Sequence, residues 1–197
     1  MPPKAKFTEK QITDAALDLV REQGIGGLTA RALRNKLGSS SCPIFTVFQN
    51  MEEVQESVIR AARAFYKKYV DRGLVETPAF KGVGTQYILF AVDEPNLFRL
   101  LFMTGQDSIP DFKGILPIID DSYEQILASI VTGYGMERDD ADRLYRHLWI
   151  YTHGIATLCV SKMCSFTGDE ISGMMTEVFI SLLRNFKEKE YERAAQK

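Results

Sequence analysis

Helix-start signals recur along this chain, and each precedes a stretch with helical periodicity. The signal is Ser, Thr or Asn followed three residues later by Glu or Gln, whose side chains satisfy backbone N–H groups left without partners in a helix's first turn. Three such pairs are present: Thr8/Gln11, Asn50/Glu53 and Thr167/Glu170. The apolar residues that follow recur at intervals of three and four, and no stretch alternates convincingly as a β-strand would. The sequence therefore predicts an all-α fold.

The apolar spacing and the Gly and Pro residues set the expected bounds of the elements. We expect helices at residues 8–23, 29–37, 50–72, 87–92, 95–103, 116–132 and 139–164, a short one opening at Ser40 and a last one from 167. A Gly/Pro-containing link is expected at 73–84. The helix at 139–164 is apolar on more than one side, which predicts that it is buried from two directions.

Composition narrows the class of protein. The 197 residues are 45% hydrophobic and 25% charged, as in an ordinary globular chain. No apolar run is long enough for a membrane span, and the first residues lack a signal-peptide core. Three cysteines without a C-x-x-C motif argue against a disulfide framework and a zinc site. We expect a cytoplasmic protein with no metal, no cofactor and no membrane partner.

Charge is distributed unevenly. Residues 1–72 contain 12 Lys/Arg against 8 Asp/Glu, whereas residues 73–197 contain 12 against 18. A basic N-terminal part is typical of a surface that attracts phosphate, although chance segregation of charge remains an alternative.

Residues 29–50, TARALRNKLGSSSCPIFTVFQN, contain two short helical patterns around a glycine turn. Short helix, turn and short helix is the plan of a helix-turn-helix, whose second helix enters the DNA major groove. Ile44 and Phe48, four apart, predict its inward face. The alternative is a helical corner whose serines only cap and turn; the outward Phe45 and Cys42 favour DNA binding, because neither suits a merely solvated face.

Residues 7–54, FTEKQITDAALDLVREQGIGGLTARALRNKLGSSSCPIFTVFQNMEEV, resemble the DNA-binding domain of the tetracycline-repressor (TetR) family of bacterial regulators without gaps. FRLLF with Trp149-x-x-x-His153-Gly154 resembles a WHG-type C-terminal subfamily. The resemblance implies a DNA-binding domain at 1–50 and an effector-binding and dimerisation domain at 51–197. It also implies a homodimer formed by the last two helices. The implied function is that of a transcriptional repressor, which a small, largely apolar ligand releases from a pseudo-palindromic operator.

The resemblance has departures at positions that often contact phosphate. The family commonly has a basic residue at Ser41, Tyr at Phe45, His at Val47 and Lys at Met51. Several usual phosphate contacts are therefore missing, and we expect the contacts to double-stranded DNA from the following residues: Thr29, Arg31, Lys36, Ser40, Ser41, Phe45 and Thr46.

The middle helices supply candidates for an effector pocket. These are Phe90, Phe98, Phe102, Phe112, Tyr123, Trp149 and His153. For each of them, plain core packing is the alternative role.

Other classes of function receive less support. An enzyme is not expected, because the chain has no nucleophile–base pair, phosphate loop or metal cluster and only two histidines. A helical interaction or thiol-sensing module of the same fold, with weakened DNA binding, is the remaining alternative, motivated by the missing basic residues and by Cys42, Cys159 and Cys164.

Overall fold

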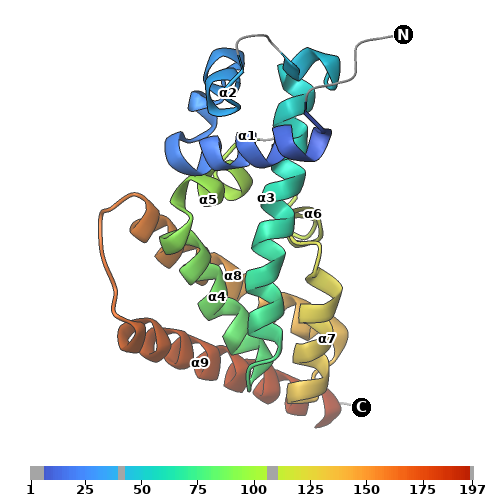
Figure 1. The fold of residues 1–197 in the computed structure, drawn as a ribbon. Helices are drawn as coiled ribbons and strands as arrows, with labels where there is room; N and C mark the ends of the chain where they lie inside the picture. Colours follow the sequence, from blue (N-terminus) through green and yellow to red (C-terminus); the bar gives the residue numbers. More distant parts are fainter. Residues whose placement is uncertain (1–6, 40–42, 106–110, 196–197) are drawn as a thin grey trace. The chain divides into compact units, whose positions relative to one another are not determined.

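The computed structural model describes residues 7–39, 43–105 and 111–195, and within them it contains only helices and turns (Figure 1). The predicted all-α fold is confirmed. The helices are α1 Glu9–Gln23, α2 Ala30–Lys36, α3 Met51–Leu74, α4 Ala79–Asp93, α5 Pro95–Phe102, α6 Ile115–Ile119, α7 Tyr123–Tyr134, α8 Arg138–Val160 and α9 Gly168–Ala195, with 3-10 turns η1 Ile25–Gly27 and η2 Pro43–Thr46. None of the helices described combines the length and hydropathy that crossing a lipid bilayer requires.

The chain forms two compact units, each with its own core. The smaller unit comprises Met1–Tyr66 and Asp93–Gln106, and the larger unit comprises Lys67–Val92 and Asp107–Lys197. The expected boundary at 50/51 falls at the start of α3, whereas the compact units divide within α3. The smaller unit also includes α5, because α5 packs against α1. The assignment of functions to 1–50 and 51–197 stays a prediction.

Local sequence explains how α1 and α2 begin. The Thr8 hydroxyl accepts the Gln11 N–H at 3.2 Å, and the Gln11 side chain accepts the Thr8 N–H at 2.9 Å, so the predicted capping box is confirmed. Thr29 caps α2 by accepting the Ala32 N–H. The apolar face of α1 is buried as predicted, with Ile12 and Ala16 fully inaccessible.

The expected helix opening at Ser40 differs from prediction where it is described. Its first residues, 40–42, lie outside the described residues, and the rest is the 3-10 turn η2 rather than an α-helix. Asn50 already caps α3 by accepting the Glu53 N–H at 2.8 Å, which leaves room for little more than one turn after Pro43. The inward positions are nevertheless confirmed, because Ile44 and Phe48 are both buried.

Two expected boundaries in the larger unit are wrong. The link predicted at 73–84 is short, because α3 continues to Leu74 and α4 begins at Ala79. A Cβ on Gly73 would lie 2.5 Å from the Val83 nitrogen, so the glycine is what permits these two helices to approach. The helix predicted at 116–132 is broken into α6 and α7, since the Asp120 side chain accepts the Ser122 N–H and stabilises a turn between them.

Helix α8 packs against α7 and α9, which confirms that it is buried from two directions (Figure 1). It ends at Val160, four residues earlier than predicted, and Lys162 with φ 59° turns the chain toward α9. One core cluster joins α4, α8 and α9 through the following buried residues: Ile88, Ile155, Ile171 and Met175.

Candidate functional sites

The predicted DNA contacts on α2 are exposed, and two of them also have structural partners. Arg31 lies on the outer face of α2. Lys36 forms an ion pair with Glu22 of α1, with Nζ 2.5 Å from Oε1, and the Thr29 hydroxyl is already an acceptor in the helix cap. Arg31 is therefore the α2 cation best placed for phosphate in this group.

The turn after α2 presents Phe45 to solvent between two buried anchors. Its side chain is 47% exposed, while Ile44 is fully buried and Phe48 is 5% exposed. Thr46 is also exposed. An exposed ring and a hydroxyl, held by a buried pair, can contact sugar, phosphate or a thymine methyl group. Ser40 and Ser41 lie outside the described residues, so their expected role stays a prediction.

A shallow acidic cleft limits which side of this surface can face DNA. It is lined by Val47 and Phe48 together with charged side chains of α1 and α3: Glu9, Glu53, Glu56 and Arg60. Three carboxylates beside one guanidinium repel phosphate, so this cleft disfavours a DNA backbone. The acidic first turn of α3 was visible in the sequence but was not used to predict this limit.

The seven residues predicted for an effector pocket are divided between the two compact units. Phe98 and Phe102 belong to the smaller unit, where their ring centroids lie 5.2 Å apart. In the larger unit, Phe90 is fully buried and meets the Tyr69 ring edge-on at 5.2 Å. Phe112 is 49% exposed, with the Arg146 guanidinium 5.7 Å from its ring centroid.

Tyr123 has a structural environment of its own. Its hydroxyl donates to Asp142 at 2.7 Å, and its ring stacks on Tyr145 with centroids 5.9 Å apart. Burial and the hydrogen bond to Asp142 raise the pKa of Tyr123 to about 12. These contacts link α7 to α8, so the residue serves as packing in the structure.

Trp149 and His153 do lie together, and the structure adds a third residue, Tyr87. The two α8 rings stack with centroids 5.1 Å apart, and the Tyr87 hydroxyl lies 2.9 Å from Nδ1 of His153. Burial lowers the pKa of His153 and raises that of Tyr87, which also hydrogen-bonds with Trp149. A neutral His153 accepting at Nδ1 fits these contacts. Tyr87 was not singled out from the sequence, because it reads as one more apolar helix position.

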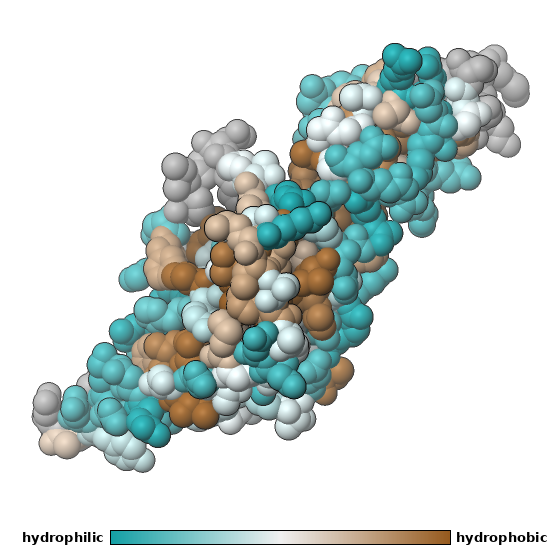
Figure 2. Space-filling view, turned by 90° about the vertical axis from the view of Figure 1, so that its left-hand side faces the viewer, coloured by the Kyte–Doolittle hydropathy of each residue, from teal (hydrophilic) through white to brown (hydrophobic). Residues whose placement is uncertain are grey.

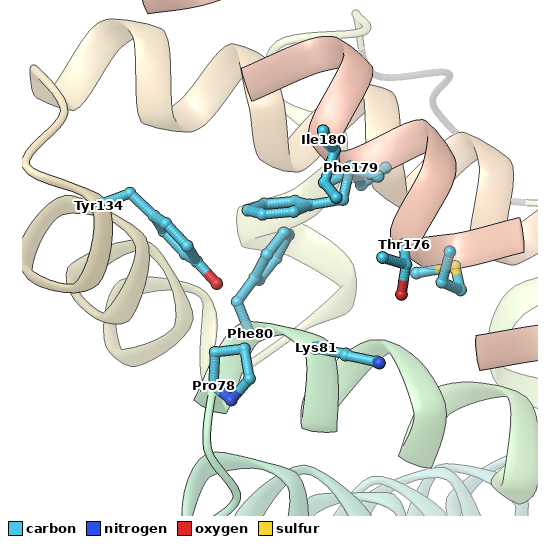
Figure 3. Close-up of a pocket in the computed structure, with 9 residues that line it drawn as sticks. Pro78, Phe80, Lys81, Tyr134, Thr176, Phe179 and Ile180 are labelled. Atoms are coloured by element: carbon cyan, nitrogen blue, oxygen red, sulfur yellow. The ribbon is translucent and has the colours of Figure 1, made fainter. Parts of the chain in front are cut away.

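A separate cavity of about 300 Å³ opens in the larger unit, and none of the seven predicted residues lines it (Figure 3). We call it the Lys81 pocket. Its walls come from the start of α4, the end of α7, α8 and α9: Pro78, Phe80, Lys81, Tyr134, Leu148, Met175, Thr176, Phe179 and Ile180. The one signal for it in the sequence is a single cation, Lys81, near the start of the otherwise uncharged stretch AFKGVGTQYILF.

Helix α8 also exposes an apolar stripe. Ile150 is 49% exposed and Leu158 is 36% exposed, and Gly154 stands between them on the same face. A Cβ on Gly154 would meet nothing within 4 Å, so the chain's own packing does not require glycine there. Hydrophobic residues are grouped between hydrophilic ones on the face shown in Figure 2.

Comparison with known proteins relates the chain to a family and to solved structures. The family model described as "Tetracyclin repressor-like, C-terminal domain" matches residues 80–184. Among solved structures, a protein with unknown function from Rhodococcus sp. RHA1 is similar, with a TM-score of 0.68 and 17% identity over 94% of this chain and 99% of that chain. At this identity the likeness concerns the fold. No curated protein matches the chain.

Proposed function

Because the chain belongs to the family with a tetracycline-repressor-like C-terminal domain, we propose that it is a DNA-binding transcriptional repressor, released from a pseudo-palindromic operator by a small, largely apolar ligand. The observation that carries the DNA-binding part is Phe45, which is 47% exposed between buried Ile44 and Phe48 on the turn after α2. A large ring held outward by two buried neighbours is suited to a contact that water does not provide.

The DNA-contacting surface consists of α2 and the segment that follows it. Arg31 neutralises a backbone phosphate, while Phe45 and Thr46 reach the sugar or base edges. The carboxylates of the acidic cleft, Glu9, Glu53 and Glu56, restrict the orientation of the protein on DNA, because they repel the phosphate backbone.

A homodimer supplies two such surfaces. The exposed stripe Ile150, Gly154 and Leu158 on α8 supports dimerisation through α8 and α9, since a glycine between two apolar residues lets a second helix approach closely. Two copies spaced by about 34–36 Å, one turn of DNA, bind a palindromic site. A ligand releases the DNA only if it binds another spacing of the two copies more tightly.

The test is binding to DNA selected from a random pool and to the gene's own upstream DNA, from about 0.05 M to about 0.2 M salt. We expect saturable binding that weakens with salt, and Phe45→Ala and Thr46→Ala to weaken it by about tenfold or more. Tyr191→Ala is the control, because Tyr191 is also an exposed aromatic residue, at 76%, but lies in the larger unit. The proposal fails if no sequence is enriched, or if Phe45→Ala and Thr46→Ala both bind like the wild type.

The second candidate is a helical interaction or thiol-sensing module of this fold with weakened DNA binding. The ion pair between Lys36 and Glu22 favours it, because it occupies one of the few cations near the turn. Thiol sensing receives less support than interaction, since burial raises the pKa of Cys159 and disfavours its reactive thiolate. Failure to enrich any DNA sequence in the same selection is the outcome that favours this candidate.

A further inference from the structure

The walls of the Lys81 pocket are aromatic on three sides. Phe80, Tyr134 and Phe179 come from α4, α7 and α9, and their rings are tilted against one another (Figure 3). The Phe179 centroid lies 4.9 Å from that of Tyr134, with 56° between the ring planes, and 6.2 Å from that of Phe80, with 55°. Tilted rings offer both faces and edges, which are the two surfaces an aromatic guest packs against.

The polar groups of the pocket are few and favour a negative charge. Among the described residues that line it, Lys81 is the only cation, and none is Asp or Glu. Among the described residues, no salt bridge of Lys81 to a carboxylate is present. An ammonium group without a carboxylate partner beside an apolar cavity attracts an anion more strongly than it would in open water.

Two hydroxyl groups complete the polar set. The Thr176 hydroxyl donates its hydrogen to the Ser172 carbonyl at 2.6 Å, so toward the pocket it can only accept. Burial raises the pKa of Tyr134, so this phenol keeps its hydrogen at neutral pH and can donate it. In Figure 3 the Tyr134 hydroxyl lies on the side of Phe80, and the Lys81 amine lies on the side of Thr176.

From this arrangement we infer that the Lys81 pocket binds a small aromatic anion, such as an aromatic carboxylate, with its rings against Phe80, Tyr134 and Phe179 and its charge toward Lys81. A cavity of about 300 Å³ suits one or two fused rings and excludes long-chain amphiphiles. The inference deepens the proposed function, since it names the chemistry of the effector, and it rests on that function only for the effect on DNA.

The binding test uses 2-naphthoate as the probe and the full chain, with calorimetry as the readout. The matched probe is 2-naphthalenemethanol, which has the same rings without the charge. We expect 2-naphthoate to bind at least about tenfold more tightly than the alcohol. Equal affinity for the two probes, or no binding of 2-naphthoate at millimolar concentration, would overturn the inference.

Variants locate the charge that is responsible. Lys81→Gln is expected to weaken 2-naphthoate about tenfold and to leave the alcohol unchanged, which removes the preference for the anion. Lys189→Gln, which removes an exposed lysine of α9 outside the pocket lining, is expected to change neither affinity. A preference that survives in Lys81→Gln overturns the assignment to this pocket. The comparison of the two probes on the unaltered chain does not depend on the folding of any variant.

DNA binding is measured separately, so the two proposals can fail independently. Naphthoate binding without any enriched DNA sequence leaves the pocket inference standing and contradicts the repressor proposal. DNA binding with no preference for the anion leaves the repressor proposal standing and contradicts the pocket inference. If both hold, saturating 2-naphthoate is expected to weaken the selected DNA complex in the wild type and not in Lys81→Gln.

Discussion

The guanidinium of Arg21 in α1 donates hydrogen bonds from two nitrogens to the carboxylate of Glu94, which directly precedes α5. Nε lies 2.8 Å from Oε2, and Nη2 contacts Oε1. The Glu94 side chain is only 10% exposed, and Asn96 donates from its side chain to the Arg21 carbonyl at 2.8 Å. A bidentate pair of this kind fixes direction as well as distance, so α5 is held to α1 within the smaller unit.

Arg21→Gln is expected to destabilise the protein by about 1–3 kcal/mol, because it leaves a nearly buried Glu94 carboxylate without its cation. Urea-induced unfolding of the wild type and the variant measures the change in the free energy of unfolding. Lys10→Gln is the control within the same unit: it removes a pair with Asp14 in which both side chains are more than half exposed, and it is expected to cost less than about 1 kcal/mol. Equal costs for the two variants would show that burial of Glu94 does not strengthen the pair.

Gly73→Ala is expected to cost about 1–3 kcal/mol, because its new methyl group would lie 2.5 Å from the Val83 nitrogen and 2.6 Å from the Val83 Cα. Backbone atoms of α4 cannot move aside as a flexible side chain would. Gly133→Ala in α7 meets nothing within 4 Å, so the same substitution there is expected to stabilise by about 0.5–1 kcal/mol through helix propensity. Thermal unfolding of the two variants should therefore shift in opposite directions.

Acidification is expected to destabilise the fold partly through His153. Burial lowers the pKa of His153 in the folded chain below its ordinary value of 6.5. Between the lowered pKa and the ordinary one, the unfolded chain binds more protons, so the free energy of unfolding decreases as pH falls through this window. The loss of Tm between about pH 7.5 and about pH 5.5 should be smaller in His153→Gln than in the wild type. His147→Gln, on an exposed position, should retain the wild-type loss.

Ile150→Glu is expected to convert a dimer into a monomer, since it places a charge within the exposed α8 stripe. Sedimentation equilibrium of the wild type and the variant measures this. Leu89→Glu alters a residue that is 39% exposed on α4 rather than on α8, and it should leave the dimer intact. A wild type that is monomeric at micromolar concentration contradicts dimerisation through this surface.

How far the sequence could predict the fold depended on whether the deciding interaction was local. The caps at Thr8, Thr29 and Asn50 were predictable, because each partner lies within three residues. The Pro at the start of α5 and the left-handed Gly135 after α7 were local signals too. The break between α6 and α7 was missed, because the apolar spacing continues across the Asp120 turn.

The candidate sites were less predictable, because pockets are made by residues far apart in sequence. Phe98 and Phe102 carry the same apolar signal as Phe90, yet they pack in the smaller unit, since Arg21 and Glu94 bring α5 to α1. No spacing rule connects Phe80, Tyr134 and Phe179, whose rings meet in the Lys81 pocket. The outward position of Phe45 was predictable, because its buried neighbours Ile44 and Phe48 are four apart.

The smaller unit is assembled from two separate stretches of chain, and this bears on how hybrid regulators are built. A fusion that joins residues 1–50 to a foreign body discards α5 and with it the partner of Arg21. In the fusion, Arg21 would then lack its carboxylate partner, and the face of α1 that α5 covers would be exposed to solvent. A fusion that keeps the smaller unit intact must include residues 93–106 as well as 1–66, so it needs more than one junction.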